Sequence, residues 1–369
     1  MKVLLTHELF APDFAGGGEY IVLEVARGLK RRRVDVSVLT TGNPSIREYE
    51  GIPTVRLPIH RHRFNLAVRK TAEMACQADV IQTFSYHAGL PALLAGKLTG
   101  KPVVYFTLAL YQDLWKQMRS PLMGGLFSAW ERFLITRNFA RVLFLSDHSR
   151  DLGLSLGVPA TRAVVIPPGI ELKAYAPAEP KEDVVLFSGK LDVRKGIDDL
   201  LEVARALPHV RFRVVGWGPR EAQLRGAAPR NVEFTTFLRG EPLYRAFGAA
   251  RIFFFPTQGE TFGIVIAEAM ASGCAVVSTV PLGYEGALVP IGDRAAMIKA
   301  IQRLWDDPAE TTRMGRRNVE LSQSYNWERF MDALLRCYEE VLCGGSGELP
   351  VFTSAAVSGT PNKTRGSNP

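Results

Sequence analysis

Cysteine is scarce in this chain of 369 residues, and its spacing fits neither a metal site nor a disulfide framework. The four cysteines are Cys76, Cys274, Cys337 and Cys343. We expect all of them to be reduced thiols. The chain also lacks an Asp-x-Asp pair that could hold Mg²⁺, because Asp198-Asp199 and Asp306-Asp307 are adjacent pairs in helical segments. We therefore expect no metal ion.

Long uncharged runs are also rare. One stretch, Thr261 to Tyr284, could span a bilayer by length, and Glu268 is its only charge. Gly273 and the valine pair after it divide this stretch into a helix followed by a strand, which predicts part of an α/β core. The apolar run at residues 1–8 is too short for a signal peptide, so we expect a cytosolic protein.

Neither sign of charge dominates strongly, although 45 basic residues exceed 37 acidic ones and give a net charge of +8. This excess permits an acidic partner. Nucleic acid is not expected, because no zinc, RNP or helix-turn-helix motif accompanies the charge. An anionic membrane surface or a diphosphate substrate explains it better.

Strand and helix patterns alternate along the chain in two successive series. The first predicts strands at 2–6, 34–40, 54–58, 79–84, 102–107, 141–146 and 163–167, and the second at 184–187, 211–215, 231–234, 251–255 and 275–278. In the second series helices are expected to begin near residues 196, 219, 241, 261 and 293. Such alternation predicts two mostly parallel, doubly wound, Rossmann-like α/β domains. A proline-rich linker near 170–182 separates domains expected at 1–170 and 171–325, and the tail at 344–369 is expected to be disordered.

The segment 260–268, Glu-Thr-Phe-Gly-Ile-Val-Ile-Ala-Glu, contains two carboxylates with seven residues between them. Glu268 lies among apolar helix formers, where an unpaired charge costs several kcal/mol, on the order of a buried ion without a partner. A vicinal diol such as a ribose would hydrogen-bond it. The turn at Thr261, Phe262 and Gly263 offers free amides for a diphosphate. The alternative is a half-buried Glu268 paired with an arginine.

Other segments place similar chemistry at strand ends, where open α/β sheets bind ligands. Lys190 and Lys195 follow the strand at 184–187, and Gly216 follows the strand at 211–215. Solvated lysines near a turn are the alternative. Three glycines, Gly16, Gly17 and Gly18, permit close backbone approach between the first strand and first helix, or form an ordinary flexible loop.

The order of these motifs, with Pro-Pro-Gly at 167–169 before them and Tyr-Asn-Trp-Glu at 325–328 after them, resembles the retaining glycosyltransferases of family 4. These enzymes have the GT-B fold and use nucleotide sugars. The resemblance covers residues 1 to about 343 and implies that a final helix at 326–343 crosses back to the first domain. It implies catalytic roles for Glu260, Lys190 and Lys195. It implies substrate contacts for Glu268, Gly16, Gly17, Gly18, Gly216, Thr261, Phe262 and Gly263.

The sequence departs from that family at three places. Leu108 stands where a histidine is usual, and His87 is the nearest substitute, with a structural loop histidine as the alternative. Lys190 replaces the usual arginine. The loop at 280–286 is shorter than usual, which leaves the contacts normally made there unassigned.

The resemblance implies retaining transfer of a hexose from a UDP- or GDP-sugar to an acceptor hydroxyl, without a cofactor. The two lysines and the turn amides would stabilise the leaving diphosphate, whose oxygen takes the acceptor's proton. Two alternatives are a nucleotide-sugar hydrolase or epimerase of the same fold and a catalytically silent binding subunit.

Apolar and basic residues are mixed at 60–70 and 111–139. Such a mixture suits a surface that inserts shallowly among anionic headgroups, so we expect a lipid-linked or glycan acceptor and peripheral binding at the inner face of a membrane. The alternative is that the apolar residues are core faces and the cations a solvated rim.

Overall fold

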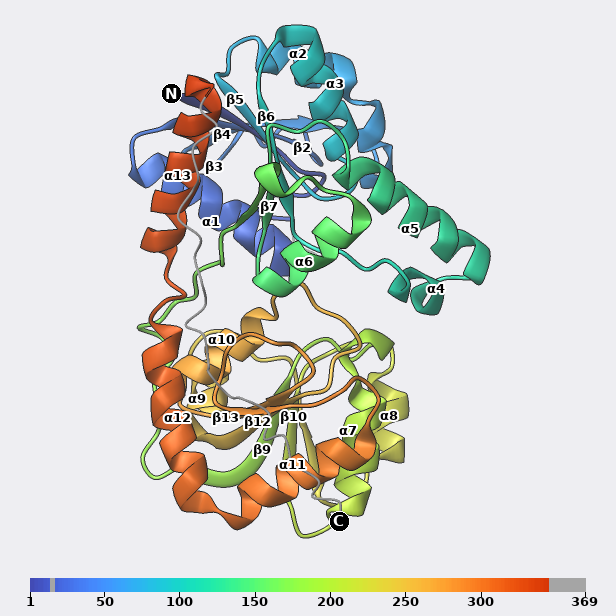
Figure 1. Ribbon diagram of the computed structural model, residues 1–369, viewed down its shortest axis with the longest axis vertical. Coiled ribbons are helices and arrows are strands. Elements are labelled where there is room, and N and C mark those ends of the chain that lie inside the picture. Colours follow the sequence, from blue (N-terminus) through green and yellow to red (C-terminus); the bar gives the residue numbers. More distant parts are fainter. Residues whose placement is uncertain (14–16, 345–369) are drawn as a thin grey trace, which may run out of the picture.

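The computed structural model describes residues 1–13 and 17–344, which form two mostly parallel sheets with helices on both faces of each (Figure 1). The predicted α/β fold with two Rossmann-like domains is confirmed. Gly16 and the tail from residue 345 lie outside the described residues. All four cysteines are free.

The first sheet contains all the strands predicted for the first series, in the order β3-β4-β2-β1-β5-β6-β7-β8. Its strands are β1 (Lys2–Thr6), β2 (Asp35–Thr41), β3 (Glu48–Tyr49), β4 (Ile52–Leu57), β5 (Val80–Phe84), β6 (Val103–Thr107), β7 (Arg141–Phe144) and β8 (Ala163–Val165). The pairs are parallel except β3 with β4. The two-residue β3 was not predicted, because so short a strand has no readable periodicity.

Helices flank this first sheet. They are α1 (Gly17–Arg31), η1 (Arg61–Leu66), α2 (Val68–Ala75), α3 (Gly89–Thr99), α4 (Leu114–Met118), α5 (Pro121–Ile135), α6 (Asp147–Leu156) and η2 (Ala160–Arg162). The α5 helix begins with a Ser120 cap and Pro121 in its first turn, which are preferred helix-start residues. Together α4 and α5 project away from the sheet in Figure 1.

The second sheet has the order β11-β10-β9-β12-β13-β14, with all pairs parallel. Its strands are β9 (Glu182–Ser188), β10 (Phe212–Val215), β11 (Val232–Thr235), β12 (Ala250–Phe255), β13 (Ala275–Ser278) and β14 (Gly286–Leu288). Every residue of β12 is buried, because helices cover both faces of a parallel sheet. The short, half-exposed β14 was not predicted.

Its helices are η3 (Val193–Lys195), α7 (Ile197–Ala206), α8 (Glu221–Ala227), α9 (Glu241–Ala249), α10 (Ile264–Ala271), α11 (Arg294–Asp306) and α12 (Pro308–Ser322). The stretch from Thr261 to Tyr284 contains α10 followed by β13, as predicted. No described helix is long and apolar enough to cross a membrane. The α12 helix was not predicted, although Asp307 caps it and Pro308 begins it.

The last helix, α13 (Trp327–Cys343), packs against α1 of the first domain (Figure 1). Tyr338, which is fully buried, donates a hydrogen bond to Gln82 of β5. Arg32 pairs with Asp332 at 2.7 Å. The chain leaves the first domain near Ile170 and returns to it near Tyr325, and there the Ile170 N–H donates to the Tyr325 carbonyl at 3.0 Å. The outgoing and returning segments therefore lie side by side.

Both sheets contain a point where the strand order reverses. In the first sheet it lies between β1 and β5, and in the second between β9 and β12. Loops that leave neighbouring strands in opposite directions open a crevice at the carboxyl ends, where open α/β sheets bind ligands. The two reversal points therefore identify where substrate groups are expected to gather.

Candidate functional site

The turn between β12 and α10 carries four of the predicted residues. Gly263 adopts φ +80° at the N-cap of α10, a conformation that favours glycine, so the helix begins at Ile264 and not near Thr261. The backbone N–H groups of Gly263 and Ile264 donate to no other group in the described part of the chain. Two free amides at a helix N-terminus can bind an anion.

Two side chains of this turn point elsewhere. Phe262 is buried and packs edge-on against Tyr325, with ring centroids 5.3 Å apart. The Thr261 hydroxyl donates to the Leu108 carbonyl at 2.9 Å, and the Ser146 hydroxyl donates to the Thr261 carbonyl at 2.5 Å. Both contacts cross from the first domain to the second. These side chains position the turn, and its amides remain the groups that can face a ligand.

Lys195 and Glu260 are brought together at the reversal point of the second sheet. The Lys195 ammonium donates to Glu260 Oε2, and both side chains are less than one-fifth exposed. Lys195 Nζ also lies 5.3 Å from the ring centroid of Phe255. Lys195 is thus a fixed cation, held by a carboxylate from the neighbouring loop.

Lys190 and Gly216 lie farther along the same edge. Lys190 is exposed, and its ammonium lies 5.5 Å from the ring centroid of Trp217. A Cβ atom at Gly216 would overlap the carbonyl of Gly189, so close packing of two loops explains the glycine. Donor contacts for both residues stay predictions.

Glu268 lies on α10 and is half-buried. Its Oε1 accepts a hydrogen bond from the Tyr175 hydroxyl at 2.6 Å, so the predicted alternative of an arginine partner is not what the structure shows. Burial raises the pKa of Glu268 to about 7, and the bond from Tyr175 opposes that rise. Tyr175 was not predicted as a site residue, although an aromatic residue within a proline-rich linker was an available signal.

The described glycines of the first glycine motif, Gly17 and Gly18, lie in the first turn of helix α1 and not in a loop, and Gly17 faces the second domain. A Cβ atom at Gly17 would lie 3.9 Å from Ile264 Cδ1, and one at Gly18 would lie 3.3 Å from Leu108 Cδ1. Helix α1 therefore begins opposite the start of α10. Leu108, which replaces the family's usual histidine, contributes its carbonyl to this junction.

Arg194 and Tyr111 form a second junction that sequence reasoning missed. The Arg194 guanidinium donates to the Tyr111 hydroxyl and to Asp192 Oδ2, each at 2.7 Å. Glu131 holds the Tyr111 segment by accepting from the Tyr111 and Gln112 amides at 3.0 and 2.8 Å. These bonds align the first domain with the loop that carries Lys195.

His87 has no free ring nitrogen. Its Nε2 lies 3.0 Å from His62 Nδ1, and its Nδ1 lies 3.1 Å from Asn65 Nδ2. Burial, followed by the charge of His62, lowers the pKa of His87 to about 4, so the ring is neutral near pH 7. This arrangement matches the structural alternative for His87. Its role as a substitute histidine stays a prediction that these contacts do not support.

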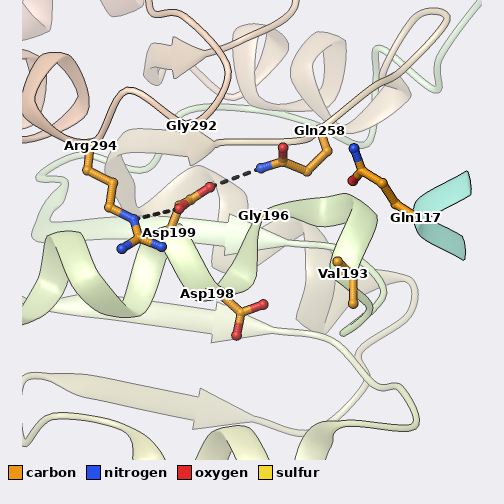
Figure 2. Close-up of a pocket in the computed structure, with 8 residues that line it drawn as sticks. All are labelled: Gln117, Val193, Gly196, Asp198, Asp199, Gln258, Gly292 and Arg294. Carbon is orange, nitrogen blue, oxygen red and sulfur yellow. Dashed lines mark hydrogen bonds and ion pairs between the residues drawn. The ribbon is translucent and has the colours of Figure 1, made fainter. Parts of the chain in front are cut away.

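A cavity of about 420 Å³ lies beside the Lys195 loop (Figure 2). None of the predicted site residues lines it. Its central carboxylate, Asp199, accepts from Arg294 at 2.7 Å and from Gln258 at 2.9 Å, as Figure 2 shows. The charges of Asp199 and Arg294 are paired with each other, and Val193 and Gly196, which flank Lys195 in the sequence, bring the cavity next to the candidate site.

Comparison with known proteins matches both domains. Residues 182–307 match a family described as "Glycosyl transferases group 1", and residues 16–169 match a "Glycosyl transferase 4-like domain". The chain belongs to the group 1 glycosyltransferases. The O-antigen chain mannosyltransferase C of Escherichia coli is 26% identical over 93% of this chain and 99% of its own. A phosphatidyl-myo-inositol mannosyltransferase of Mycobacterium leprae is 28% identical over 90% and 96%.

Solved structures confirm the GT-B fold of this glycosyltransferase. A sucrose-phosphate synthase from Thermosynechococcus elongatus has a TM-score of 0.80 at 22% identity, over 93% of this chain and 100% of its own. An Anabaena protein in complex with UDP and glucose has a TM-score of 0.74 at 20% identity, over 92% and 99%. These likenesses establish the fold of the glycosyltransferase and leave its donor and acceptor to be argued from the site.

Proposed function

We propose that this glycosyltransferase moves a hexose, with retained anomeric configuration and without a metal ion, from a GDP- or UDP-sugar to an acceptor hydroxyl. The observation that carries the proposal is the pairing of Lys195 with Glu260 beside the free amides of Gly263 and Ile264. Loss of a nucleoside diphosphate develops negative charge on phosphate oxygens. A fixed cation and two amides at one helix end stabilise that charge.

Glu268 supplies a second contact for the nucleotide. Its Oε1 is taken by Tyr175, and its other oxygen is left for the hydroxyl groups of a ribose. Diphosphate at the turn and ribose farther along α10 would place the nucleotide on the second domain. Solved relatives of this fold with UDP support a nucleotide donor, and the names of two mannosyltransferase relatives make mannose the first sugar to test.

The acceptor is lipid-linked or a glycan presented at an anionic membrane. The α5 helix is divided: Glu131, Leu134 and Ile135 are buried, whereas Leu122 and Leu126 are 76% and 58% exposed. Three exposed arginines lie on or beside it, at 119, 132 and 137. Exposed apolar side chains among cations suit shallow insertion among anionic headgroups, which would place the protein at the inner face of a membrane.

The activity test is incubation of the full chain with labelled GDP-mannose, UDP-glucose and UDP-galactose, with and without a membrane lipid extract. We expect a labelled lipid product that requires the extract. Free sugar without the extract would indicate a hydrolase, a changed sugar nucleotide would indicate an epimerase, and binding without turnover would indicate a silent subunit.

The membrane test is sedimentation with vesicles of increasing anionic lipid content. We expect binding at low salt that weakens at high salt, because headgroup attraction is screened. Leu122→Ser with Leu126→Ser should reduce binding. Leu98→Ser, at a 71% exposed leucine on α3, is the matched control and should not. Absence of binding at low salt would favour a soluble acceptor.

A further inference from the structure

Glu131 is a buried carboxylate of α5 that the reaction described above does not use. The residue is only 4% exposed. Its oxygens accept from the backbone amides of Tyr111 and Gln112 at 3.0 and 2.8 Å. They also accept from the Gln112 side-chain amide at 2.9 Å and from the Trp115 indole at 3.2 Å. Because a buried carboxylate is costly unless it is hydrogen-bonded, these donors hold Glu131 and residues 111–115 firmly together.

The segment 108–118, which Glu131 holds, is strained. Gln112 has φ +43°, and Tyr86, which stacks on Tyr111 with ring centroids 6.4 Å apart, has φ +70°. Residues other than glycine rarely adopt such angles and keep them only where the surrounding structure fixes them. Glu131 fixes Gln112 through its backbone and its side chain. Strain of this kind gathers at functional sites, so the segment is a candidate for a role in the reaction.

The segment 108–118 contacts the loop of the second domain that carries Glu260. Leu108, at the start of the segment, accepts a hydrogen bond from the Thr261 hydroxyl at 2.9 Å. Leu114 lies so close to Gly259 that a Cβ atom there would overlap its side chain. Gly259 and Thr261 are the two neighbours of Glu260 in the sequence. The segment therefore contacts this loop on both sides of Glu260.

A third contact of the segment reaches the Lys195 loop. The Tyr111 hydroxyl accepts from the Arg194 guanidinium at 2.7 Å, and Arg194 directly precedes Lys195. The Arg194 carbonyl accepts from the Gln258 amide at 2.7 Å and from the Thr257 hydroxyl at 2.9 Å. Arg194 thus joins the Lys195 loop to the next loop along the sheet edge and to Tyr111.

We propose that Glu131 is a positioning residue, which holds the segment 108–118 so that the first domain is fixed against the two loops that carry Lys195 and Glu260. It acts through the Tyr111 hydroxyl and contacts no substrate. Without this contact the two domains would shift relative to one another, and a misplacement of about 1 Å can reduce a rate about a hundredfold. The proposal rests on the proposed function, because it assumes that Lys195 and Glu260 serve sugar transfer.

Tyr111→Phe is the mildest test, because it removes only the hydroxyl and leaves the amides that Glu131 holds. With labelled GDP-mannose and the membrane lipid extract, we expect kcat to fall about tenfold, the loss expected for one hydrogen bond to a charged group. GDP affinity in calorimetry should stay within about twofold, because the groups proposed to hold GDP lie on the second domain. Tyr49→Phe, at a tyrosine of the edge strand β3, is the matched control and should keep the wild-type kcat.

A double variant separates a path through Tyr111 from two independent effects. Glu131→Gln places an amide nitrogen that cannot accept among N–H donors, so its kcat should fall at least as far as that of Tyr111→Phe. The double variant should lose no more than Glu131→Gln alone, because both changes break the same contact between the domains. Losses that multiply, or a wild-type kcat for Tyr111→Phe, would overturn the proposal.

Hydrogen exchange measures the contact between the domains without turnover. In Tyr111→Phe we expect faster amide exchange at 190–196, on the other domain from the substitution. Glu131→Gln should speed exchange both there and at 108–118. A rise at 108–118 alone would assign Glu131 to the fold of the first domain and overturn the proposal. Failure of sugar transfer from every donor would refute the proposed function, while the exchange result would still decide whether Glu131 holds the domains together.

Discussion

Lys195→Ala should reduce kcat/KM about thirtyfold. The Lys195 ammonium is held by Glu260, and 17% of the side chain is exposed, so its charge is poorly screened by water. A charge-assisted hydrogen bond to the leaving diphosphate is worth about 2 kcal/mol, and each 1.36 kcal/mol changes a rate about tenfold. Initial rates at low donor concentration measure the change directly.

The Lys195–Glu260 ion pair also predicts how the rates of the single and double variants should compare. Removing Lys195 alone leaves the Glu260 carboxylate, 18% exposed, without its cation beside a departing anion. The double variant Lys195→Ala with Glu260→Gln removes both charges, so its loss should be smaller than the product of the two single losses. Lys299→Ala, at an exposed lysine on α11, is the matched control. Single-variant rates within twofold of the wild type, or additive losses, would refute the assigned role of the pair.

Three further outcomes are expected. Lys190→Arg should leave kcat/KM unchanged or raise it, because a guanidinium binds phosphate through two donors; a loss as large as that of the alanine variant above would contradict this role. Glu268→Gln should weaken UDP and GDP binding in calorimetry. The Glu268 carboxyl of the wild type has a pKa of about 7 when folded and near 4.5 when unfolded, so the folded protein binds more protons and loses stability as the pH rises from 5 to 8. Glu268→Gln lacks this carboxyl. Its unfolding free energy should therefore gain about 2 kcal/mol relative to that of the wild type over the same pH range. Tyr175→Phe removes a bond that lowers the pKa of Glu268, so the midpoint of pH-dependent UDP binding should move above 7, and an unmoved midpoint would contradict the coupling.

The alternation of strands and helices could be predicted because strands that are buried on both faces have long apolar runs in their sequence. β12 is the clearest case, since Ile252 to Phe255 are all apolar and buried. The two-residue β3 and the half-exposed β14 carry no such run. The α12 helix was missed because its mostly polar sequence weakens the helical period, although its cap residues were readable.

The site was predictable only where its residues share a local motif. Glu260 and Glu268 could be found because seven residues separate them, and the turn chemistry between them is local. Tyr175 could not, since it reaches Glu268 from 93 positions away through the fold. The Arg194–Tyr111 bond depends on how two domains are placed, which no local pattern records.

The side-by-side crossing of the chain has a mechanical consequence. The two domains are joined by the outgoing segment at Ile170 and the returning segment at Tyr325, and one backbone hydrogen bond ties these segments together. Two adjacent connections act as a single hinge between the domains. The Thr261–Leu108 and Arg194–Tyr111 hydrogen bonds also join the two domains. Opening for a bulky acceptor therefore needs a few hydrogen bonds to break while the anchoring of α13 on the first domain stays intact.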